Sequence, residues 1–88
     1  IFLQYLLQIF QNDIFFFQFM LTNTSDVTGN VIAKIPKECA TNKQVWFPIY
    51  ESNGGNYIGR GTINGENVAV IQIKKFSSET VGFCTYAV

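Results

Sequence analysis

The side chains best suited to hold a ligand in this sequence lie between positions 46 and 60. Trp46, Tyr50 and Tyr57 each combine a flat apolar face with a polar atom at its rim, an arrangement that suits stacking against sugar rings. Aromatic residues also dominate protein cores and subunit interfaces. Packing within or between subunits is therefore the alternative interpretation of all three residues.

Polar groups accompany these aromatic residues along the chain. Glu51, Asn53 and Asn56 flank a Gly-Gly pair and are able to hydrogen-bond ligand hydroxyls, although turn formation and solvent exposure explain them equally well. Arg60 stands between two glycines, which allow another backbone or a ligand to come close. Its guanidinium suits an ion pair across strands or between subunits, or else a carboxylate or phosphate group on a glycan.

Residues for catalysis are sparse. Histidine is absent, which removes the usual general base near neutral pH and the commonest metal ligand. The Gly-Arg-Gly at 59–61 precedes a strand rather than a helix, unlike a nucleotide-binding loop. Carboxyl groups lie in or beside expected turns, with no apolar pocket predictable around a pair of them: Asp26, Glu38, Glu51, Glu66 and Glu79. We therefore expect a protein that is not an enzyme and holds neither a metal nor a cofactor.

The composition indicates a small domain that hides part of its surface against another chain. The 88 residues suffice for one domain, residues 1–88. Hydrophobic residues make up 48% and charged residues 14%, well below the quarter typical of soluble domains. Six basic residues balance six acidic ones, so no positive field favours nucleic acid. Because the sequence opens at Ile1 within an apolar run, we interpret it as a fragment of a longer protein.

The apolar stretch of residues 1–21 predicts a β-hairpin rather than a membrane span. Polar residues interrupt it before the 18 or so apolar residues that a bilayer requires. Four of its glutamines fall on a helical stripe, so an amphipathic helix is the alternative. The phenylalanine-rich run at 14–19 nevertheless favours strands, and Gln11-Asn12-Asp13 is a turn triplet whose Asn and Asp tolerate positive φ.

A three-residue loop sets the expected register of this hairpin. Phe10 then pairs with Ile14, and the three glutamines at 4, 8 and 18 share one face with several apolar residues. A two-residue loop would scatter these glutamines over both faces. The opposite face is expected to collect Leu3, Tyr5, Leu7, Ile9, Phe15, Phe17, Phe19 and Leu21. Because the glutamine face also carries Leu6, Phe10, Phe16 and Met20, we expect a partner surface to cover it.

Beyond residue 21, short strand-like runs alternate with turn residues at a regular spacing. This pattern predicts an all-β fold, an antiparallel β-sandwich (jelly-roll-like) of about seven short strands. In the third strand, Val31, Ala33 and Ile35 are expected to point inward. In the fourth, Val45, Phe47 and Ile49 face away from Trp46, Pro48 and Tyr50, and Pro48 indicates a sheet edge or a bulge. The expected strands are residues 1–10, 14–21, 30–35, 44–52, 56–64, 67–75 and 80–88.

Two cysteines are too few for a disulfide scaffold. Neither Cys39 nor Cys84 belongs to a C-x-x-C pair, so we expect two small buried hydrophobic residues. A single bridge between them is the alternative in a secreted recognition domain.

The order of motifs in the second half of the chain resembles that of a known family. A strand ends in Ile-Pro at 35–36, Val-Trp-Phe-Pro-Ile follows at 45–49, and a glycine-rich hairpin with Gly-Arg-Gly-Thr-Ile occupies 53–68. This succession resembles the C-terminal receptor-binding head domains of phage tail-fibre and baseplate proteins, chiefly of phages that infect Gram-positive bacteria. The resemblance covers roughly residues 11–88. It departs after Pro36, where Cys39 and Ala40 replace the aromatic residue and second proline common in the family.

The resemblance implies an antiparallel β-sandwich that assembles as a homotrimer at the tail tip of a virion and is made in the host cytoplasm. Its implied ligand is a saccharide of the host cell wall, bound without nucleic acid or membrane insertion. The alternative is a structural or assembly domain of a fibre that makes protein contacts only.

Overall fold

The computed structural model describes residues 2–22, 30–71 and 79–88. These residues form seven strands and a short 3₁₀ helix: β1 (Phe2–Gln11), β2 (Ile14–Thr22), β3 (Asn30–Lys34), η1 (Lys37–Cys39), β4 (Thr41–Glu51), β5 (Tyr57–Gly65), β6 (Asn67–Ile71) and β7 (Glu79–Ala87). The predicted all-β fold is confirmed, and the helical alternative for residues 1–21 is wrong. Residues 72–75 of the sixth predicted strand lie outside the described residues, as does most of each loop predicted at 22–29 and 76–79.

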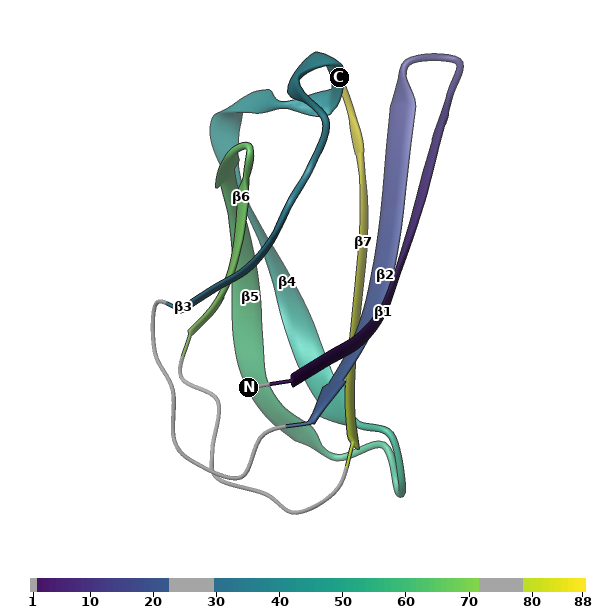
Figure 1. Ribbon diagram of the computed structural model, residues 1–88, viewed down its shortest axis with the longest axis vertical. Helices are drawn as coiled ribbons and strands as arrows, with labels where there is room; N and C mark the ends of the chain where they lie inside the picture. Colours follow the sequence, from purple (N-terminus) through teal and green to yellow (C-terminus); the bar gives the residue numbers. More distant parts are fainter. Residues whose placement is uncertain (1, 23–29, 72–78) are drawn as a thin grey trace.

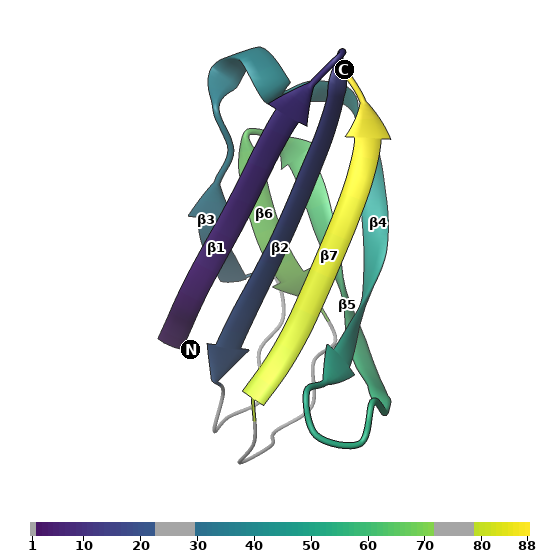
Figure 2. The same cartoon turned by 90° about the vertical axis from the view of Figure 1, so that its right-hand side faces the viewer.

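The strands form one antiparallel sheet that folds over on itself. Its order is β1-β2-β7-β4-β5-β6-β3, so β7, the last strand, joins the first hairpin to β4. Figure 1 shows two layers, with β1, β2 and β7 on one side and β3 to β6 on the other. In Figure 2, β1, β2 and β7 run side by side in front of the remaining strands. The predicted sandwich is therefore built from a single continuous sheet.

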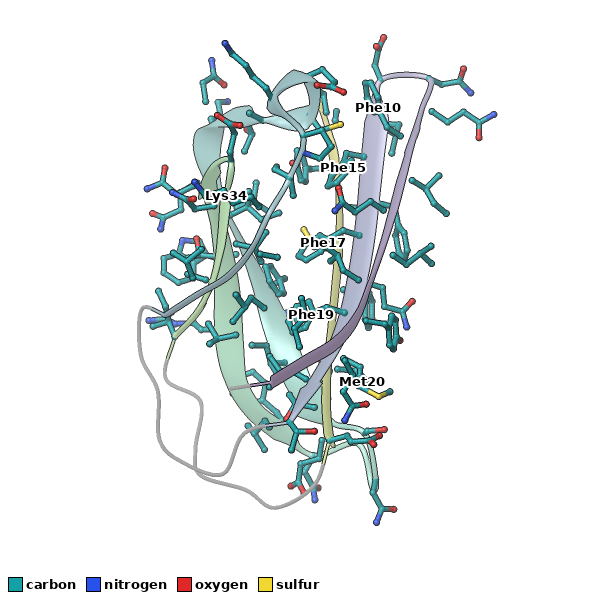
Figure 3. All side chains as sticks on the ribbon, viewed as in Figure 1. Phe10, Phe15, Phe17, Phe19, Met20 and Lys34 are labelled. Carbon is teal, nitrogen blue, oxygen red and sulfur yellow. The ribbon has the colours of Figure 1, made fainter. Side chains whose placement is uncertain are left out.

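The core fills the space between the two layers. From β2, alternate residues point inward, and Phe15, Phe17 and Phe19 are almost wholly buried (Figure 3). Phe47 of β4 meets Phe17 and Phe19 edge-on, with ring centroids 5.3 and 6.0 Å apart. Each such contact contributes about 0.5–1.5 kcal/mol beyond the burial of apolar area. Other core residues come from the facing layer: Ile49, Ile58, Ile63, Val68 and Val70.

Two glycines make room for the aromatic rings. A Cβ atom on Gly61 would lie 2.3 Å from Cζ of Phe47, and one on Gly82 would lie 2.5 Å from Cζ of Phe19. Both residues therefore lie beneath a phenylalanine ring on the inner surface of the sheet. Gly61, which follows Arg60, therefore makes room for the ring of Phe47. The sequence had suggested that the glycines beside Arg60 allow another backbone or a ligand to come close.

The predicted register of the first hairpin is wrong. Asn12 and Asp13, with φ of 55° and 63°, form a two-residue turn, so Gln11 pairs with Ile14 and Phe10 with Phe15. Both residues adopt left-handed conformations, as in the hairpin turns whose twist matches that of the flanking strands. Gln8 pairs with the inward-facing Phe17, whereas Gln18 pairs with Leu7 on the outer face. These two glutamines therefore lie on opposite faces of the hairpin.

This shift changes which residues of β1 face the core. Leu6 lies opposite the buried Phe19 and packs partly against the core. Tyr5, Leu7 and Ile9 were predicted to share one face with the residues of β2 that prove to be buried. They lie instead on the other face and are exposed. A register shift between Leu3 and Tyr5 keeps Leu3 against the core, a local irregularity that alternation along the strand does not predict.

A similar irregularity alters β3. Ile35 is buried and Ala33 packs partly against the core, as predicted. Val31, in contrast, pairs with Ala69 and is 55% exposed, because the register shifts between Val31 and Ala33. The predicted inward position of Val31 is therefore wrong.

Candidate functional site

The seven residues singled out as ligand-binding candidates all lie on β4, β5 or the turn between these strands. Along β4, Phe47 and Ile49 are buried, whereas Trp46 and Pro48 are exposed and Tyr50 is half-buried. This alternation confirms the predicted faces of the strand. Pro48 directly precedes the stretch of β4 that pairs with β7, Ile49–Glu51, so it lies at a local sheet edge, as predicted.

Arg60 lies over the ring of Trp46. Pro48 is the direct cross-strand partner of Arg60 and Thr62 that of Trp46, so the arginine and the tryptophan are diagonal neighbours. The guanidinium carbon is 4.6 Å from the centroid of the indole ring, within the range of a cation–π interaction. Both side chains are exposed, and Trp46 keeps 47% of its surface accessible. The contact therefore holds a positive charge beside an accessible aromatic ring.

The two tyrosines form a second aromatic pair on the same hairpin. The rings of Tyr50 and Tyr57 meet edge-on, with centroids 6.2 Å apart. Their strands shift register between Ile49 and Tyr50, which brings Tyr57 opposite Tyr50. Tyr57 is 62% exposed, more than any other large hydrophobic residue described. We call Trp46, Tyr50, Tyr57 and Arg60 together the β4–β5 platform.

The remaining candidates lie in the connection between β4 and β5. The backbone N–H of Glu51 donates to the carbonyl of Asn56 at 2.8 Å, and the N–H of Gly55 donates to the carbonyl of Glu51 at 3.1 Å. Gly54 and Gly55 have positive φ, which explains the glycine pair. Asn53 and Asn56 are exposed and Glu51 is half-buried. Their polar groups therefore border the Tyr57 end of the platform.

The chemistry available to the platform is non-covalent recognition. Its aromatic rings offer flat apolar surfaces, and its guanidinium offers planar hydrogen-bond donors to an oxygen-rich group. The two thiols lie elsewhere, free and buried, as the preferred prediction required. Burial raises the pKa of the Cys84 thiol to about 11, and burial together with Glu38 raises the pKa of Cys39. Both thiols are therefore protonated, and weakly nucleophilic, at neutral pH.

The opposite layer carries a second exposed surface. The sequence predicted an apolar outer face on the first hairpin that includes Phe16 and Met20, but it assigned the wrong residues of β1 to that face. Because β1 is displaced by one residue, its outward side chains join those of β2 and β7. We call this surface the apolar face, and its members are Tyr5, Leu7, Ile9, Ile14, Phe16, Met20, Val81 and Phe83. The pair Asn12-Asp13, which fits a two-residue turn, was the signal in the sequence that pointed to this arrangement.

Within residues 2–22, 30–71 and 79–88, no three Cys, Asp or Glu side chains come together as a metal-binding cluster. The same ranges contain no helix with the length and hydropathy needed to cross a membrane. No protein-family model, curated protein or solved structure matches the chain.

Proposed function

We propose that the protein recognises a saccharide of a bacterial cell surface through the β4–β5 platform, as the receptor-binding head domain of a phage tail fibre or baseplate. The observation that carries this proposal is the pairing of accessible aromatic rings with a neighbouring cation on two adjacent strands. Support also comes from the order of motifs in the sequence, which resembles that family. Strands position these side chains more rigidly than free loops would.

Each group of the platform has a role in this proposal. Tyr57 and the exposed part of Trp46 stack against sugar rings, and the asparagines of the turn hydrogen-bond hydroxyls. Arg60 binds a phosphate or carboxylate group carried by the glycan, because the guanidinium fork matches the geometry of these groups. A single site of this size binds weakly. The homotrimer implied by the resemblance would strengthen attachment through avidity.

Cosedimentation of the purified protein with isolated cell walls from Gram-positive bacteria tests this proposal. We expect saturable binding that Tyr57→Ala and Arg60→Ala each weaken about tenfold or more, the loss typical of a hot-spot residue. Lys34→Ala is the matched control for Arg60→Ala, because Lys34 is an exposed cation on β3, away from the platform. The control should bind like the native protein.

Absence of binding to any bacterial wall polymer would overturn the proposal. Equal losses in Arg60→Ala and Lys34→Ala would also contradict it, since they would indicate non-specific attraction between charges.

A second candidate function is a structural domain of a fibre that makes protein contacts only. The apolar face favours it, because several large side chains there are about half exposed. A ligand role for the platform and an assembly role for the apolar face use different layers of the sandwich. If Trp46, Tyr50 and Tyr57 proved to be covered by neighbouring subunits in the assembled particle, the structural function would replace saccharide recognition.

A further inference from the structure

The apolar face is a continuous surface formed by three neighbouring strands. The register places Leu7, Gln18 and Phe83 side by side across β1, β2 and β7. A second row consists of Ile9, Phe16 and Thr85, and a third of Tyr5, Met20 and Val81. Figure 2 shows these three strands lying side by side on the outside of one layer. The exposed apolar side chains are therefore neighbours.

The polar groups within these three rows are few and uncharged. Gln18 lies in the centre, and its side-chain amide donates to the hydroxyl of Tyr5 at 2.9 Å. Since part of its hydrogen-bonding capacity is met within the face, removing it from water costs less than for an unpaired amide. None of the nine residues in the rows carries a formal charge. A partner that covers them must also be uncharged there.

The area of the face is sufficient for a specific contact. Tyr5, Leu7, Ile9, Ile14 and Phe83 are between 39% and 51% exposed. With roughly 200 Å² for a large side chain, these five leave about 450 Å² in contact with water, and Phe16, Met20 and Val81 extend this to about 500–600 Å². The total is at the upper end of the largest patch on a typical monomer. If a partner contributes an equal area, the total buried surface reaches the roughly 1,000 Å² expected of a biological interface.

We propose that the apolar face is the surface through which copies of this chain associate. A second copy supplies the same uncharged, flat and apolar surface, so no charge is buried unpaired, and each copy covers the exposed rings of its neighbour. Layers of sheet pack face to face about 10 Å apart in β-sandwiches, the geometry that this contact requires. The inference does not rest on saccharide recognition, because association is measured without any saccharide.

Sedimentation velocity of the native protein between about 1 and 100 μM tests the proposal. We expect a species of at least twice the 10.0 kDa chain mass. Two substitutions, Phe83→Lys and Leu7→Lys, each place a charge within the face. Each should raise the dissociation constant of the oligomer at least tenfold and so shift the protein to the monomer. Circular dichroism and urea unfolding confirm that each variant is folded. Phe83→Ser, which adds no charge, should weaken association less.

Val31→Lys is the matched control, because Val31 is an equally exposed aliphatic residue on the outer surface of the opposite layer. It should leave the oligomer unchanged. A native protein that is monomeric at 100 μM would overturn the proposal. So would an oligomer that persists in folded Phe83→Lys, or one that Val31→Lys disrupts to the same extent.

Discussion

Among single side chains, Phe47 links the two layers of the sandwich. Its ring meets Phe17 and Phe19 edge-on from the opposite layer and covers Gly61 of the neighbouring strand. The close approach to Gly61 uses the space where any other residue would carry a Cβ atom. On the other surface of the same hairpin, Arg60 and Trp46 form their contact. One core ring thus packs directly behind the platform.

Substitution of Gly61 tests this packing. Gly61→Ala should lower the free energy of unfolding by about 2–3 kcal/mol, because the new methyl group would overlap the ring of Phe47. In a Phe47→Leu background the same substitution should cost much less, which gives a coupling energy above about 1 kcal/mol in a double-mutant cycle. Urea unfolding of the four proteins measures it. If Gly61→Ala lowered the free energy of unfolding equally in the two backgrounds, the ring of Phe47 would not be the cause of the loss.

Among the strands, the first hairpin shows how a turn sets the surface of a whole layer. The alternation of residue types along β2 predicts which of its residues point inward. Which residues of β1 point inward beside them depends on the length of the turn. A two-residue turn at Asn12-Asp13 displaces β1 by one position relative to a three-residue loop. As a result, Tyr5, Leu7 and Ile9 form part of an exposed apolar surface.

A glycine at the second turn position should stabilise the protein. Asp13 has φ of 63°, a conformation that costs an ordinary residue free energy and glycine almost none. Asp13→Gly should therefore raise the free energy of unfolding by about 0.5–1 kcal/mol, whereas the β-branched Asp13→Val should lower it by more than about 1 kcal/mol. Thermal and urea unfolding measure both changes. If Asp13→Gly proved the less stable of the two, the two-residue turn would be wrong.

In the complete sandwich, ionisable groups from separate elements meet near the core. Tyr86 of β7 donates its hydroxyl to the carbonyl of Cys39 in η1 at 2.7 Å, and its ring packs 5.5 Å from that of Phe15. Burial, with contributions from Cys39 and Cys84, raises the pKa of Tyr86 to about 12. Burial raises the pKa of Cys84 to about 11. The folded protein therefore favours the neutral forms of both groups.

Stability should consequently fall at alkaline pH. In the unfolded chain these groups ionise near pH 9 for Cys84 and pH 10 for Tyr86, so their contribution is complete below pH 9. It declines as the pH rises through 9–11 for the thiol and 10–12 for the phenol. Urea unfolding at pH 7.5 and pH 10.5 should show a lower free energy at the higher pH, and Cys84→Ala should reduce that difference.

Tyr86→Phe separates the hydrogen bond from the ionisation. At pH 7.5 it should cost about 1 kcal/mol, because the carbonyl of Cys39 loses its donor. It should also reduce the loss on going to pH 10.5. Tyr57→Phe, at an exposed position, is the control and should alter neither value. A native protein that is as stable at pH 10.5 as at pH 7.5 would contradict these assignments.

Most of the strands, and the side of β4 that carries its platform residues, could be predicted from local sequence pattern. The β-favouring residues, the glycine-rich turns and Pro36 mark where strands begin and end, because these properties depend on neighbours in the chain. Alternation along β4 correctly placed Trp46, Pro48 and Tyr50 on one surface. The contact between Arg60 and Trp46 was not predicted, since it depends on the register of β5 against β4.

Local pattern therefore determined an all-β chain with a hydrophobic core and an excess of apolar surface. Only the folded structure decided where that excess lies, through the turn at Asn12-Asp13 and the register shifts beside Leu3 and Val31. A strand alternates with a period of two, so one extra or missing residue moves its whole apolar set to the other surface. The position of β7 between β2 and β4 was equally beyond local pattern, because it pairs residues far apart in the chain.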